Sequence, residues 1–64
     1  MTAFSVFFCE AERCSIKQVR AMDPEHAIAQ VRNQVPQVRR VAVVPDALLE
    51  GVDTQQLLQD WIQV

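Results

Sequence analysis

The segment from Phe4 to Cys9 limits the possible folds most strongly, because it is apolar on both sides of an extended chain. Successive side chains of a β-strand point to opposite faces of the sheet. Phe4, Val6 and Phe8 therefore share one face. Phe7 and Cys9 share the other. A strand that is apolar on both faces is typical of the centre of a sheet whose two faces are both covered.

Residues 3–9 and 14–22 are predicted to be the two strands of a hairpin. Both are rich in Phe, Val and Ile, and the polar residues 10–13 separate them as a four-residue loop. Pairing Cys9 with Cys14 sets a register in which Phe7 faces Ile16 and Phe4 faces Val19. This register predicts a second apolar patch on the sheet, made by Phe7, Cys9, Cys14 and Ile16.

A helix is predicted over residues 24–35. Asp23 can cap its free N–H groups, and Pro24 suits the first helical position. Ala27, Ile28, Val31 and Val35 recur at helical spacing and form one apolar stripe. The helix is expected to end before Pro36, because a residue that precedes proline is disfavoured in helical geometry.

The remaining residues predict a third strand and a last helix. Residues 38–44 form the strand, which Pro45 ends, and residues 46–50 make one helical turn that Gly51 closes. Asp53 or Thr54 caps the last helix, which continues to the C-terminus. Its apolar side carries Leu57, Leu58, Trp61 and Ile62.

These elements predict an α+β fold with the order β-β-α-β-α in a single domain of residues 1–64. A right-handed crossover through residues 24–35 makes the third strand parallel to the second. The predicted sheet therefore has three strands in the order 2-1-3, with one helix on one face and an amphipathic C-terminal helix. Either this last helix or another molecule covers the second face.

Cys9 and Cys14 have the spacing C-x4-C, and no second pair of metal ligands accompanies them. Because His26 is the only other soft ligand, no metal site is expected. With no export signal, two free thiols that act as small apolar fillers are expected. A disulfide across the strands is geometrically possible if the two residues oppose each other.

No catalytic constellation is predicted. His26 is expected to face water, and neither Ser5 nor Ser15 lies in a nucleophile motif. The single glycine, Gly51, excludes a phosphate-binding loop. We therefore expect no enzyme activity and no cofactor.

Charge is unevenly distributed along the chain. Residues 13–40 hold all six Lys and Arg residues, whereas every charged residue in 41–64 is acidic. Arg20, Arg39 and Arg40 could form a basic edge for a nucleic-acid-binding regulator. The pI near 5.1 and the absence of Tyr make this the alternative hypothesis.

The main hypothesis is a small non-catalytic protein-interaction module, either a homodimer or an accessory or regulatory subunit, that acts through an apolar face of its sheet. An outer strand left unpaired, strand 2 or strand 3, offers a second route by pairing backbone to backbone. The partner is then a second copy or another protein. No apolar run is long enough to span a bilayer, and residues 1–12 carry no signal-peptide pattern, so a cytoplasmic protein without membrane contact is expected. The predicted interaction residues are Phe7, Cys9, Cys14, Ile16 and Trp61.

Overall fold

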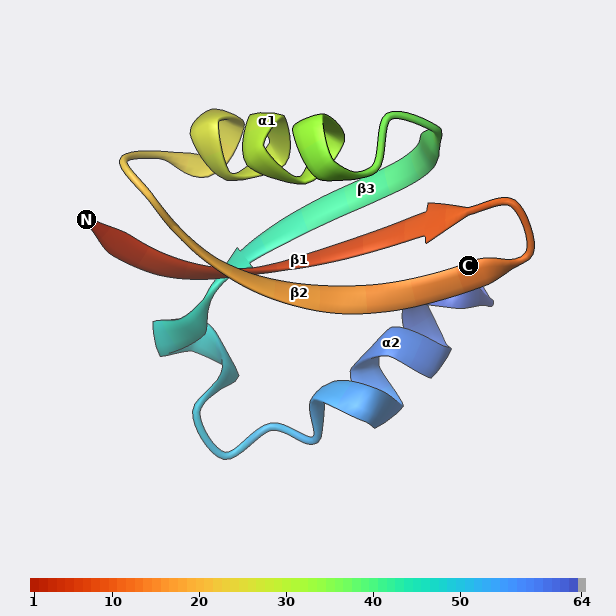
Figure 1. Ribbon diagram of the computed structural model, residues 1–64. Coiled ribbons are helices and arrows are strands. Elements are labelled where there is room, and N and C mark those ends of the chain that lie inside the picture. The colour runs from red at the N-terminus through yellow and green to blue at the C-terminus, as the bar shows by residue number, and fades with distance from the viewer. Residues whose placement is uncertain (64) are drawn as a thin grey trace.

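The computed structural model describes residues 1–63 and confirms the predicted α+β fold and order of elements. The elements are β1 (Thr2–Glu10), β2 (Arg13–Ala21), α1 (Pro24–Gln34), β3 (Val38–Pro45), the 3₁₀ helix η1 (Asp46–Leu49) and α2 (Thr54–Ile62). The sheet has three strands in the order β2-β1-β3, and β1 runs antiparallel to both neighbours. Figure 1 shows α1 on one face of the sheet and α2 on the other.

The β1–β2 hairpin has the predicted register. Cys9 pairs with Cys14 and Phe7 pairs with Ile16. The loop is shorter than predicted, because Glu10 and Arg13 also pair and leave only residues 11 and 12 in the turn. Ala11 occupies this turn with a φ of 50°, in the left-handed region that L-residues other than Gly rarely adopt.

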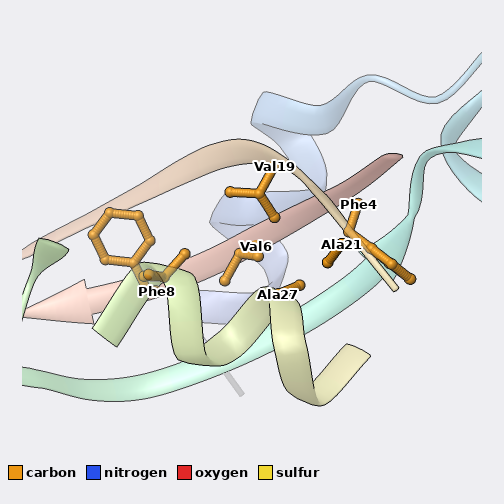
Figure 2. Close-up of a cluster of buried hydrophobic side chains, with 7 residues drawn as sticks. Phe4, Val6, Phe8, Val19, Ala21 and Ala27 are labelled. Carbon is orange, nitrogen blue, oxygen red and sulfur yellow. The ribbon is translucent and has the colours of Figure 1, made fainter. Parts of the chain in front are cut away.

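The main hydrophobic core lies between α1 and the sheet (Figure 2). Val6 and Val31 are the largest fully buried side chains in it, and Ala21 and Ala27 are also fully buried. The alternating side chains of β1 predicted that this face of the sheet would be apolar, and the apolar stripe along α1 predicted that the helix would pack on it. The core consists of Phe4, Val6, Phe8, Val19, Ala21, Ala27 and Val31, with Val35, Val38, Val41 and Val43 packed against it.

Aspartate side chains cap both α-helices. An Asp23 carboxylate oxygen accepts a hydrogen bond from the His26 N–H at 2.8 Å. Asp53 accepts hydrogen bonds from the N–H groups of Gln55 and Gln56, at 3.1 and 3.2 Å. These bonds satisfy N–H groups that have no partner inside the helix. Of the two residues that the sequence offered for α2, Asp53 and Thr54, the cap is therefore Asp53.

A bulge interrupts the pairing of β3 with β1. Cys9 pairs with Arg40, whereas the next residue of β1, Glu10, pairs with Val38. Arg39 is therefore the extra residue of β3. Because paired residues share a face, Arg40 lies on the same face as Cys9, which is the face covered by α2.

Within residues 1–63, no helix is long and apolar enough to cross a membrane.

Candidate functional site

The second face of the sheet is covered by the chain's own C-terminal helix. Phe7 is only 2% exposed, and its ring centroid lies 5.9 Å from that of Trp61, with the two planes at 90°. The sequence left open whether this helix or another molecule covers the face, and in the structure the helix does. Phe7 is therefore packed inside the domain and is not presented to a partner as the interaction hypothesis assumed.

Arg40 holds the last turn of α2 against the sheet. Its guanidinium carbon lies 4.6 Å from the centroid of the Trp61 ring, which is a cation–π geometry. One of its terminal N–H groups also donates a hydrogen bond to the Trp61 carbonyl oxygen at 3.3 Å. Arg40 thus makes a structural contact within the domain, although the sequence analysis placed it on a basic edge.

The three arginines of the alternative hypothesis do not form one edge. Arg20 lies on β2 opposite Ala3, whereas Arg40 lies on β3 opposite Cys9. Strand β1 separates the two edges, and the positions differ by six residues along it, or about 20 Å at the usual rise of a strand. The three arginines therefore do not make the single basic surface that was predicted.

Cys9 and Cys14 form a disulfide, which corrects the expectation of free thiols. Their Cα atoms are 4.0 Å apart. In an antiparallel ladder, directly opposed residues alternate between wide pairs and close pairs, and this is a close pair. The predicted register already placed the two cysteines opposite each other. Free thiols were expected because the sequence carries no export signal, not because of the geometry of the pair.

The five predicted interaction residues do lie on one face of the sheet or against it. Cys9 is buried together with Phe7, whereas the other three are partly exposed. Phe7 and Trp61 make the contact between α2 and the sheet, and strand pairing places Cys9, Cys14 and Ile16 on the same face as Phe7. The partly exposed members are Cys14, Ile16 and Trp61.

A polar groove lies on the α2 face of the sheet, where β1 and β2 meet η1 and the start of α2. The sequence did not predict it. Ser5 is 2% exposed, and its hydroxyl donates a hydrogen bond to the Asp46 carboxylate at 2.6 Å. The only signal was a serine within the most apolar segment of the chain. The groove has a volume of about 390 Å³ and is lined by Ser5, Gln18, Asp46, Ala47, Leu49, Glu50 and Thr54.

His26 is exposed on α1, as predicted, and its Nδ1 accepts a hydrogen bond from the Met22 N–H at 3.2 Å. Ser5 lies on the opposite face of the sheet, so the two side chains do not form a nucleophile and base pair. Within the described part of the chain, no three or more His, Cys, Asp or Glu side chains are grouped to hold a metal ion.

The two outer strands of the sheet are both basic but differ in where their charges lie, because those of β3, Arg39 and Arg40, are confined to its start. Strand β2 carries Arg13, Lys17 and Arg20, and such charges discourage pairing with another strand. The last five residues of β3, Val41–Pro45, carry no charge and are all partly exposed. Strand β3 is therefore the outer strand that is better suited to pair with a further strand.

Comparisons with protein-family models, curated proteins and solved structures find no significant match to this chain.

Proposed function

We propose that this chain is a small protein-interaction module that forms a homodimer by pairing the outer edge of β3 with β3 of a second copy. The observation that carries the proposal is the uncharged, partly exposed segment Val41–Pro45 on an outer strand. The proposal keeps the class of function that the sequence suggested. It moves the interaction surface from the sheet face to the sheet edge, because α2 covers that face.

The hairpin geometry indicates which backbone groups of β3 point outward. A two-residue turn makes Glu10 and Arg13 exchange both of their hydrogen bonds. Alternation along β1 then directs the backbone groups of Cys9 towards β3, and those of its partner Arg40 towards β1. By the same alternation, the N–H and C=O groups of Val41 and Val43 point away from the sheet.

Charge favours the antiparallel arrangement of the two β3 strands. Each strand begins near Arg39 and Arg40 and is followed by Asp46. A parallel pair would place the arginines of the two copies side by side. An antiparallel pair centred on Ala42 sets Val41 of one copy opposite Val43 of the other, and it brings the basic end of one strand towards Asp46 of the second copy.

The side chains of β3 leave apolar surface on both faces near the edge. Val41 and Val43 lie at the margin of the α1 core, and Ala42 and Val44 lie on the other face. Ala42 and Val44 remain partly exposed on the α2 face. Pairing of two copies would continue both layers across a six-stranded sheet and bury these side chains.

Sedimentation equilibrium with two matched variants tests the proposal. By the alternation above, Val43→Pro removes an outward N–H from β3, and Gln18→Pro removes an outward N–H from β2. We expect a wild-type dimer with a dissociation constant in the micromolar range, because edge interfaces are small. Val43→Pro should be monomeric, whereas Gln18→Pro should remain dimeric, with circular dichroism confirming that both variants are folded.

A wild-type monomer throughout the micromolar range would overturn the homodimer. Loss of the dimer in Gln18→Pro alone would assign the contact to β2 instead. We include the cytoplasm in the proposal as the place of action. Its thiol buffers act on disulfides, and the Cys9–Cys14 disulfide joins β1 to β2. Because the β3 edge contains neither cysteine, the dimer should persist in reductant.

A further inference from the structure

The polar groove on the α2 face continues into a second hollow, and pairing of β3 does not account for the charges of Glu50 and Arg20 that line the two. The groove of about 390 Å³ and the adjoining hollow of about 290 Å³ share Gln18 and Asp46 as walls. Glu50 lines only the first, and Arg20 lines only the second. The depression thus carries Asp46 where the two hollows meet, with a second acidic group on one side of it and a basic group on the other.

We propose that this groove binds a free α-amino acid with an apolar side chain. The ammonium group is held by the carboxylates of Asp46 and Glu50, and the carboxylate is held by the guanidinium of Arg20. The side chain of the ligand packs against Ala47 and Leu49. A zwitterion fits this pattern, because a simple cation would leave Arg20 without a role and a simple anion would be repelled by the acids.

The structure orients Asp46 for such a role. The hydroxyl of Ser5 is almost completely buried and donates its hydrogen bond to one oxygen of the Asp46 carboxylate. Hydrogen bonds of this length to an ionised group are strong and directional. The carboxylate is therefore held in one orientation before a ligand arrives, and its remaining acceptor positions can receive an ammonium group.

Strand register places the basic group beside the acidic one. Ser5 pairs with Gln18, and Ala3 pairs with Arg20, so all four side chains share the α2 face. Gln18 lines both hollows, and its amide can donate and accept hydrogen bonds. The volume of the larger pocket lies within the range of small-molecule sites.

The amino-acid site does not require the homodimer, although Asp46 takes part in both proposals. One wall of the groove is built by β2, which lies on the other side of β1 from β3. Pairing at β3 therefore leaves the groove open on its β2 side. Failure of the dimer would leave the amino-acid site untouched, and the converse also holds.

Titration of the isotope-labelled protein, followed by NMR chemical shifts, tests the site with three related probes. They are L-leucine, its decarboxylated analogue 3-methylbutylamine, and its deaminated analogue 4-methylpentanoate. We expect L-leucine to give saturable shifts in residues 3–5, 18–20 and 46–54. Each analogue should bind about tenfold more weakly or worse, because it lacks one charged contact.

Matched variants assign the two ends of the site. Arg20→Gln should weaken L-leucine binding about tenfold and leave the affinity for 3-methylbutylamine unchanged. Glu50→Gln should weaken both. Arg32→Gln on α1 removes a positive charge outside the groove, and Asp60→Asn on α2 removes a negative one. Both variants should bind L-leucine as tightly as the wild type does.

Two results would overturn the proposal. One is the absence of saturable shifts with L-leucine while the protein remains folded. The other is equal affinity for L-leucine and 3-methylbutylamine, which would show a cation site that makes no use of Arg20.

Discussion

The ring of Trp61 stands edge-on to the ring of Phe7, with the centroids 5.9 Å apart, and so joins α2 to the centre of the sheet. Arg40 packs on the same indole ring and binds the carbonyl oxygen of Trp61. Trp61 therefore connects a nine-residue helix to both β1 and β3. An isolated helix of that length is marginal in water, so its packing on the sheet must provide most of its stability.

Trp61→Ala should detach α2 and expose Phe7. We expect the free energy of unfolding to fall by about 2–3 kcal/mol, somewhat less than for a fully buried tryptophan. Urea denaturation followed by circular dichroism measures the change, and hydrogen exchange should accelerate in residues 54–62. Ile62→Ala is the control on the same helix, because Ile62 is exposed. Equal losses in the two variants would contradict the anchoring role of Trp61.

Reduction of the Cys9–Cys14 disulfide should destabilise the hairpin moderately. The bond closes a short loop, with a sequence separation of 5. Chain-entropy arguments give about 2 kcal/mol for such a loop. Denaturation with and without reductant measures this difference. The double variant Cys9→Ala, Cys14→Ala should unfold at the lower urea concentration regardless of reductant, and a wild-type protein insensitive to reductant would contradict the prediction.

The sequence predicted the parts of this fold that depend on local pattern. Alternation within β1 set the two faces, and pairing Phe7 with Ile16 gave the observed register. The cap at Asp23 and the proline at position 36 fixed the limits of α1 to within one residue. Each of these features depends on residues close together in the chain, where sterics and hydrogen bonding leave few choices.

Contacts between distant segments were not predictable in the same way. Ser5 and Asp46 are 41 positions apart, and their contact depends on how η1 follows β3. The interaction of Arg40 with Trp61 depends on where α2 lies across the sheet, which periodicity does not specify. The turn at Ala11 was missed because alanine does not favour the left-handed conformation that a tight turn requires.

Ala11→Gly should stabilise the protein. Ala11 has a φ of 50°, where a Cβ atom costs about 1–2 kcal/mol and glycine has no such penalty. After the greater chain entropy of unfolded glycine is subtracted, a gain of about 0.5–1 kcal/mol in unfolding free energy is expected. Ala29→Gly on the exposed side of α1 is the matched control and should lower stability by about 1 kcal/mol. The same sign for both substitutions would contradict the assigned turn geometry.

Ser5→Ala should destabilise the protein through Asp46. The substitution removes a buried hydroxyl that donates to the carboxylate at 2.6 Å, so we expect a loss of about 1–2 kcal/mol. Ser15→Ala on the exposed part of β2 should change stability by less than about 0.5 kcal/mol.

A double-mutant cycle separates this hydrogen bond from general effects of packing at Ser5. Asp46→Ala alone removes the same bond, so adding Ser5→Ala should cost much less than it does in the wild type, with a coupling of about 1 kcal/mol. Urea denaturation of the four proteins supplies the cycle. Strict additivity of the two losses in unfolding free energy would show that the side chains do not stabilise each other. It would contradict the claim that Ser5 holds the Asp46 carboxylate in one orientation at the groove.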